Sequence, residues 1–152
     1  MNPQLERMNK LLVLACSIFA LIGSTPSTSA EDWPAWRGLL GDGTVNDPDA
    51  PVEWKLPENL VWKIPLPGKG HASPIILGDR IYLVTAMEEE QTSDLICLDR
   101  ATGKKLWSKV VLKSPFEGVH RLNSRASSTP SSDGERIYLS FLDRDKMFVA
   151  AY

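Results

Sequence analysis

Cysteine is scarce in this chain, which has only two cysteines among its 152 residues. Cys16 lies in an apolar segment near the start, so Cys97 is the one cysteine of the remaining sequence. A single cysteine cannot form an intramolecular disulfide or a cysteine-rich metal site. Cys97 stands within the apolar run Leu95-Ile96-Cys97-Leu98, a setting that predicts a buried and unreactive thiol.

An excess of positive charge is also absent, since the sequence has 17 lysines and arginines but 19 acidic residues, and its formal net charge is −2. Binding to nucleic acid needs a clustered basic face that attracts phosphates. The sequence therefore predicts no DNA or RNA partner. Its 43% hydrophobic and 24% charged residues are typical of an ordinary globular protein.

The main apolar run is too short to cross a membrane as a helix, which takes roughly 20 residues. This run, residues 11–22, follows Arg7 and Lys10 and precedes small and polar residues that end at Ala30. The order is typical of a secretory signal peptide, so we predict cleavage after Ala30 and an exported protein, periplasmic or secreted, without a stable membrane span. Two alternatives stay open: the leader is retained as a membrane anchor, or Cys16 is a lipid attachment site.

Sustained helical spacing of apolar residues is absent after residue 30, so no long helix is predicted there. Short runs rich in isoleucine, valine, tyrosine and tryptophan alternate with turn residues, as is typical of strands. The fold class that follows is all-β. The first four strands are predicted over residues 73–77, 80–86, 94–98 and 105–111.

The strand pattern repeats along the chain. The segment Gly78-Asp79-Arg80-Ile81-Tyr82-Leu83 returns as Gly134-Glu135-Arg136-Ile137-Tyr138-Leu139, an offset of 56 residues that Ser73-Pro74 and Thr129-Pro130 share. A repeat of about 40–55 residues that holds four short strands is typical of β-propeller blades. We therefore predict a partial β-propeller of about one and a half four-stranded antiparallel blades, a complete blade over 73–111 and a partial blade over 128–152.

Two further segments precede the blades. Residues 60–66 echo the outermost strand of the complete blade and are predicted as a closing outer strand without its own blade. Residues 31–58 contain four prolines and are predicted as an extended strap over the propeller surface, because proline restricts strands to edges. Trp33, Trp36 and Trp54 are expected to pin this strap into grooves or, alternatively, to form an exposed aromatic binding patch. The predicted organisation is a signal peptide over 1–30, the strap over 31–58 and an incomplete propeller over 59–152.

The turn between the third and fourth strands of the complete blade carries the residues predicted to dock one blade on the next. Asp99 can accept backbone N–H bonds within the turn, and Gly103 can adopt a positive φ at little steric cost. Trp107 is expected to lie across the neighbouring blade and to bury on the order of 150–250 Å². Thr102 completes the turn, and Trp62 takes the place of Trp107 in the closing strand.

Leu98-Asp99, Thr102-Gly103-Lys104 and Trp107 together resemble the tryptophan-docking repeat of the pyrroloquinoline-quinone-like (PQQ-like) β-propellers. Other segments are similar to exported members of that superfamily, so the resemblance covers nearly all of residues 32–152. It implies a propeller fold. The superfamily includes quinone-dependent alcohol dehydrogenases, the propeller subunit of the outer-membrane β-barrel assembly machine, and exported proteins of unassigned role, so the fold alone does not decide the activity. The similar segments are residues 32–38, 42–43, 59–63 and 120–130.

The dehydrogenases that this resemblance includes need a quinone pocket, a calcium ion with carboxylate and amide ligands, a catalytic aspartate and two adjacent cysteines. No adjacent cysteines occur here, and Glu88-Glu89-Glu90 is predicted as a solvated charge run on a hairpin loop. No catalytic residue or metal ligand is therefore predicted, and no cofactor is evident. PQQ and calcium are expected only if the chain is part of a full-length dehydrogenase.

A few polar residues precede the innermost strands of the two blades. His71 comes before the first of these strands, and His120, Asn123 and Arg125 come before the second, so these side chains could contact a ligand near the mouth of the central channel. The alternative is that they are ordinary loop residues that satisfy backbone groups. Two histidines without an acidic or thiol pair do not make a metal site.

The sequence thus favours a non-catalytic binding or scaffold module, the N-terminal piece of an exported propeller. Its expected partner is another protein or the remaining blades of the same propeller. The alternative function is the N-terminal part of a quinone-dependent dehydrogenase whose cofactor residues lie beyond residue 152.

Overall fold

The computed structural model of the chain describes residues 31–47, 50–116 and 118–152. The predicted signal peptide, residues 1–30, lies outside the described residues. In the described part every regular element is a strand, which confirms the all-β prediction, and no helix there is long and apolar enough to cross a membrane. The strands are β1 Ile75–Leu77, β2 Arg80–Met87, β3 Thr92–Asp99, β4 Lys105–Lys113, β5 Ser131–Ser132, β6 Ile137–Asp143 and β7 Lys146–Ala151.

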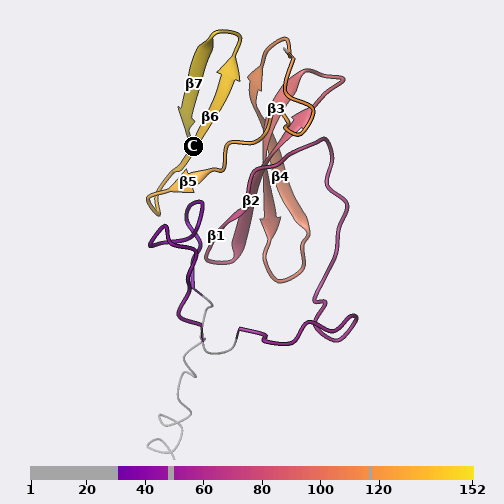
Figure 1. The fold of residues 1–152 in the computed structure, drawn as a ribbon, viewed down its shortest axis with the longest axis vertical. Coiled ribbons are helices and arrows are strands. Elements are labelled where there is room, and N and C mark those ends of the chain that lie inside the picture. Colours follow the sequence, from indigo (N-terminus) through magenta and orange to yellow (C-terminus); the bar gives the residue numbers. More distant parts are fainter. Residues whose placement is uncertain (1–30, 48–49, 117) are drawn as a thin grey trace, which may run out of the picture.

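The first four strands form an antiparallel sheet in the order β1-β2-β3-β4 (Figure 1). Each strand is hydrogen-bonded to the next one along the chain, as expected where short turns join neighbouring strands. The register places Ile75, Tyr82, Cys97 and Trp107 in one row across the sheet. Because side chains alternate between the two faces of a sheet, these four residues share a face.

The second sheet repeats this arrangement with β5, β6 and β7 in sequence order. Tyr138 pairs with Ala151, as Tyr82 pairs with Cys97 in the first sheet. The offset is 56 residues from β2 to β6 but 54 from β3 to β7, because the β6–β7 turn is two residues shorter than the β2–β3 turn. The two unclosed sheets confirm the predicted partial propeller.

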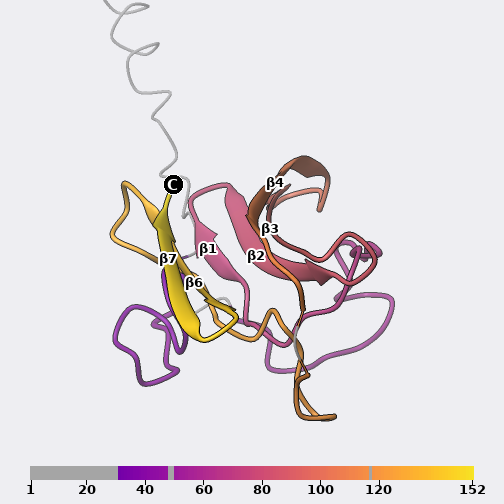
Figure 2. The same ribbon diagram turned by 90° about the horizontal axis from the view of Figure 1, so that it is seen from above.

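The sheets stack beside each other, with the β6–β7 hairpin against β1 and β2 (Figure 2). One hydrophobic core lies between them and holds residues from both. Stacking is required because a single thin sheet cannot bury its own apolar face. The first sheet contributes Ile75, Tyr82, Val84, Ala86, Leu95 and Cys97, and the second contributes Ile137, Leu139 and Phe141.

The other face of the first sheet is covered by the segment that precedes it. Thr85 Oγ1 donates a hydrogen bond to the Pro67 carbonyl at 2.6 Å, and Lys69 forms an isolated antiparallel bridge with Ala86. Ile96, whose side chain belongs to this face, is fully buried. Strands β2 and β3 of the first sheet are therefore covered on both faces, whereas most side chains of β4 are exposed.

The predicted closing strand over residues 60–66 is not a strand in the structure, since no residue in this range joins a ladder among the described residues. Pro65 and Pro67 lack the N–H groups that a ladder requires. The segment crosses the face of the first sheet instead of extending a sheet edge.

The N-terminal strap begins at the inner edge of both sheets. Trp33 exchanges two backbone hydrogen bonds with Ile76 of β1, at 2.8 and 2.9 Å, and the Pro34 carbonyl accepts a bond of 2.8 Å from the Ser132 amide of β5. The Trp33 ring also covers Gly38, where a Cβ would lie 2.8 Å from the ring. Residues 33 and 34 therefore join the two innermost strands.

The expected pinning of the strap by its other tryptophans is wrong, because Trp36 is 64% exposed and Trp54 is 82% exposed. The chain turns back on itself next to Trp36, through a hydrogen bond from the Gly38 amide to the Ala35 carbonyl. Near Trp54 the backbone bonds are local too, as from the Asn59 amide to the Lys55 carbonyl. These local turns present both indoles to solvent.

Candidate functional site

The docking turn consists of residues 99–103, between β3 and β4. Asp99 Oδ1 accepts hydrogen bonds from Thr102 Oγ1 at 2.5 Å and from the Thr102 amide at 2.8 Å. These two bonds, the side-chain bond first, lower the pKa of the Asp99 carboxyl. The Gly103 amide donates to the Asp99 carbonyl at 2.8 Å with φ at +70°. The turn is a rigid, self-bonded corner.

Trp62 packs on this corner. Its indole Nε1 donates a hydrogen bond of 2.9 Å to the Arg100 carbonyl. A Cβ on residue 103 would lie 2.5 Å from Cε3 of the Trp62 ring, so a glycine is needed there for the close approach as well as for the positive φ. A tryptophan from the segment before the blade thus contacts the third turn of that blade.

Trp107 has no such corner to pack on. It lies on the face of the first sheet that carries the second sheet, but its ring packs on Tyr82 of its own sheet, with centroids 5.9 Å apart, and it stays 37% exposed. The expectation that Trp107 lies across the neighbouring blade is therefore not met in the described residues. The physical reason is that the described part of the second sheet ends with β7 and has no turn equivalent to residues 99–103.

The two histidines of the predicted channel mouth make loop contacts. The His71 amide donates to the Ala126 carbonyl at 2.9 Å, so the segments before β1 and β5 run side by side. His120 Nδ1 accepts a hydrogen bond of 3.3 Å from the Leu122 amide of its own loop. Both side chains are exposed, and neither lines the cavity described next.

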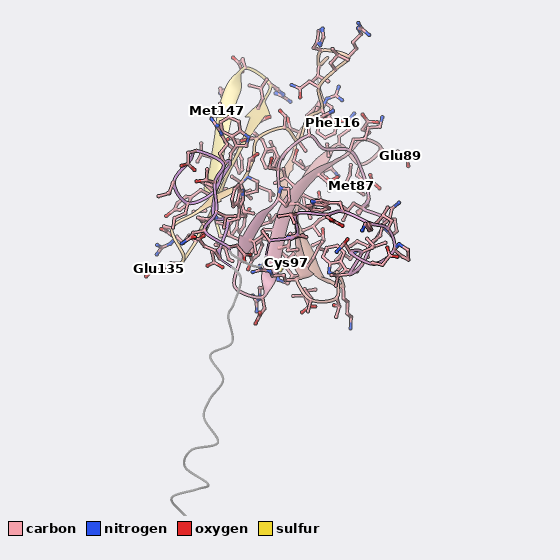
Figure 3. The ribbon with its side chains drawn as sticks, turned by 60° about the horizontal axis from the view of Figure 1, so that its bottom comes forward. Met87, Glu89, Cys97, Phe116, Glu135 and Met147 are labelled. Carbon is pink, nitrogen blue, oxygen red and sulfur yellow. The ribbon has the colours of Figure 1, made fainter. Side chains whose placement is uncertain are left out.

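Asn123 and Arg125, the other two predicted contacts, line a cavity of about 280 Å³ between the two sheets. Its walls come from the start of β3, the connection between β4 and β5, and the β6–β7 hairpin. Phe116 of the connection and Met147 of β7, both in the lining, lie toward the same end of the molecule (Figure 3). The structure therefore brings two of the four residues together and leaves the two histidines outside.

Arg125 is held in place from two sides. Its guanidinium lies over the Phe116 ring, 4.7 Å from the centroid, and Nη1 lies 3.8 Å from Glu88 Oε1. Lys69, which precedes Arg125 by the repeat offset, forms an ion pair of 2.5 Å with the same carboxylate. The acidic run is thus not simply solvated, because Glu88 joins the equivalent cations of both repeats.

Several residues of the cavity were not predicted from the sequence. Ser128 and Ser140 share a hydroxyl hydrogen bond of 2.7 Å between the connection and β6, and Phe141 contributes to both the core and the cavity wall. A sequence signal for them would have required knowledge of how the sheets stack, because the walls belong to segments far apart in the chain.

Comparison with known protein families shows to which family this chain belongs. Residues 47–147, well over half of the chain, match the family model described as outer membrane protein assembly factor BamB, a PQQ-like repeat family. This chain belongs to the BamB-like family. The repeated antiparallel meanders, the stacked sheets and the tryptophan on its glycine corner are the blade features of this BamB-like chain. No curated protein and no solved structure matches it.

Proposed function

We propose that this BamB-like chain is a non-catalytic module that binds another protein and acts as a scaffold outside the cytoplasm. Two considerations support the proposal at the level of the family: the family is described as an assembly factor, and proteins with such repeats are typically periplasmic or exported. The predicted signal peptide agrees with the same compartment.

The observation that carries the proposal is the exposure of large apolar side chains in the N-terminal strap. Scattered apolar residues are normal on a protein surface, but a concentration of them marks an interaction site. Tryptophan is also enriched at the energetic centres of protein interfaces. The exposed fractions are 64% for Trp36, 65% for Leu39, 76% for Leu40, 95% for Val52, 82% for Trp54 and 79% for Leu56.

Several acidic side chains of the described residues are engaged in bonds within the chain. In the described part, no three histidine, cysteine, aspartate or glutamate side chains gather where they could hold a metal ion. Glu88 pairs with Lys69, and Asp99 and Asp133 bond within their own turns. No catalytic step is derived from these residues.

The test is site-specific photo-crosslinking of the full chain in its native compartment. A benzophenone amino acid replaces Trp54, and a matched variant carries it at Glu135, a polar position in the β5–β6 turn. We expect a discrete covalent product with a second protein from the Trp54 position and none from Glu135. Crosslinks confined to the chain itself would contradict the proposal. Alcohol-dependent reduction of a dye after addition of PQQ and calcium would contradict its non-catalytic part.

A further inference from the structure

The second sheet has a free edge in the described part of the chain. Its strand order is β5-β6-β7, and β7 forms a ladder only with β6 there. In the first sheet the equivalent edge, that of β3, pairs with β4. An edge strand offers a row of unpaired N–H and C=O groups that a further strand can bond.

The face of the second sheet that points away from the first sheet is also uncovered. Leu142, Met147 and Val149 lie on this face and are 67%, 69% and 66% exposed. The equivalent residues of the first sheet are Ala86, Ser93 and Leu95, which are 1%, 2% and 0% exposed. The same positions are thus buried in one sheet and open in the other, so the stacking of sheets can continue at the outer face of the second sheet.

Residues 60–66 resemble a fourth strand that has no sheet. Val61-Trp62-Lys63-Ile64 echoes the segment 106–109 of β4, so residue 62 takes the place of Trp107. In β4, residue 107 lies on the face that meets the next sheet. Trp62 already makes the corresponding contact, because its indole packs on the turn 99–103 of the first sheet.

The backbone of residues 60–66 is free to join a ladder on one side. The amides of residues 62, 64 and 66 donate no hydrogen bond within the described part of the chain. Successive residues of a strand direct their N–H groups to opposite edges, so Pro65 and Pro67 fall on the edge opposite to these three amides. Proline is compatible with an edge strand in which its side of the backbone faces solvent. This segment can therefore pair with one strand only.

Within one chain, residues 60–66 cannot reach β7. The two segments lie on opposite sides of the molecule (Figure 1, Figure 2). The second sheet packs on one face of the first sheet, while the segment that continues from residue 66 bonds the other face through the Pro67 carbonyl. Two chains placed head to tail bring residues 60–66 of one beside β7 of the other.

We propose that copies of this chain associate in this way, with residues 60–66 of one copy as the fourth strand of the second sheet of its partner. In the first sheet Trp107 pairs with Cys97, and Lys109 pairs with Leu95. The same register in the new ladder sets residue 62 beside residue 151 of the partner, and residue 64 beside residue 149. Each copy then continues the stack of sheets that its partner begins.

The contact joins two different surfaces, so repeated association closes a ring or extends as a filament. Each copy supplies two sheets, and propellers close with about 4–8 blades, so a ring needs about two to four copies. Association follows mass action, so a dilute solution contains the single chain with the exposed β7 described above. The exposed tryptophans of the strap, Trp36 and Trp54, belong to neither paired segment, so this inference and the proposed function can fail separately.

Disulfide trapping between two separately tagged full chains tests the register. One chain carries Ile64→Cys and the other Val149→Cys, so a disulfide between these positions can form only between copies. Directly opposite residues of an antiparallel pair have Cβ atoms about 4.5–5.5 Å apart, close to the separation in a disulfide. We expect the mixed disulfide as the main product, identified by peptide mapping.

Lys63→Cys paired with Val149→Cys is the matched control. Lys63 is exposed and Ile64 is half-buried, so random collisions favour a disulfide from residue 63. The ladder favours residue 64, because neighbouring side chains point to opposite faces. Equal yields from the two pairs, or a higher yield from residue 63, would overturn the proposal.

Analytical ultracentrifugation of the full chain over a range of concentrations tests the association itself. We expect species of about two to four copies, or longer filaments, to increase with concentration. Val149→Glu should weaken the association by about tenfold or more, because it places a charge in an apolar contact. Val52→Glu changes a strap side chain that is 95% exposed and should leave the association unchanged.

Both glutamate variants change exposed side chains, so both should keep the circular dichroism spectrum of the parent chain. A single chain at every concentration would overturn the proposal and leave the edge of β7 to a strand from another source. An equal effect of the two variants on association would place the contact on a different surface.

Discussion

The two sheets have the same pattern and register but very different burial. Leu95 in β3 pairs with Val84 and is fully buried, whereas Val149 in β7 pairs with Ser140 at the equivalent place and is 66% exposed. Strands β2 and β3 of the first sheet are covered on one face by the second sheet and on the other by residues 62–69. Only one face of the second sheet is covered in the described part of the chain.

The tyrosines of the repeated Arg-Ile-Tyr-Leu segment make the same point. Tyr82 is 7% exposed because the second sheet lies on its face, while the hydroxyl of Tyr138 reaches outward to Asp133 Oδ2 at 2.6 Å. A position in the blade thus specifies which face a side chain belongs to, and the neighbouring blade decides whether that face is buried. Three pairs of equivalent or comparable positions and one single substitution test this difference.

The largest effect is expected at the equivalent positions of β3 and β7. Leu95→Ala should lower the free energy of unfolding by about 2–5 kcal/mol, because it leaves a cavity between the sheets. Val149→Ala should change it by less than about 0.5 kcal/mol, since the side chain is on the surface. Urea unfolding of both variants measures the difference. Equal losses would mean that β7 is as well covered as β3.

The next effect compares two turn glycines. Gly103 has φ +70° and touches Trp62, while Gly134 has φ +93° and no atom near its missing Cβ. Both alanine variants incur the strain of a positive φ, but only Gly103→Ala also displaces the indole, which should cost about 1–3 kcal/mol more. Denaturation midpoints provide the comparison. The extra loss of stability in Gly103→Ala should disappear in the double variant that also carries Trp62→Ala. If the extra loss remains, the clash is not with the Trp62 ring.

The third comparison is of thiol reactivity at two equivalent positions, residue 97 in β3 and residue 151 in β7. Cys97 is fully buried, and this burial raises the pKa of its thiol, whereas Ala151 at the equivalent place is exposed. In the Ala151→Cys variant, iodoacetamide should label residue 151 in the folded protein and Cys97 only after denaturation. Peptide mapping by mass spectrometry separates the two sites. Similar labelling rates would show that the first sheet is open to solvent.

The smallest effect concerns the outward-facing tyrosine of the second sheet. The Tyr138 hydroxyl, followed by the Arg136 and Glu135 amides, lowers the pKa of Asp133 to about 2 from its ordinary value of 3.8. A lowered pKa means that the charged form contributes stability above the ordinary value, and that this contribution is lost as the pH falls through about 2. Tyr138→Phe should move the pKa upward, measured by NMR titration of the carboxyl carbon. An unchanged pKa would exclude the phenol as the main cause.

The sequence predicted the elements that depend on local residues. Local preferences explain the β-branched and aromatic residues of β2, the repeated Gly-x-Arg-Ile-Tyr-Leu turn and strand, and the glycine corner at 103. They therefore repeat visibly along the chain, and the strands of the first sheet match the prediction closely.

The features that the sequence did not predict depend on how separate segments meet. Residues 60–66 were predicted to form a closing outer strand, but they join no ladder in the described structure. A strand needs a partner beside it, and these residues have none there. Trp36 and Trp54 were misassigned because tryptophan content does not reveal whether a groove is present. Arg125 and Phe141 line the same cavity because separate segments meet where the two sheets stack. The sequence of one segment alone does not show that these residues meet.

The central claim is that the face of the first sheet that carries Tyr82 and Val84 packs on the second sheet. Methyl–methyl nuclear Overhauser effects in the full chain test it most directly. We predict cross-peaks from Leu139 to Val84 and Ile75, and none from Leu139 to Leu83 or Ile96 on the opposite face. Cross-peaks from Leu139 to Leu83 or Ile96 would contradict the stacking of the two blades.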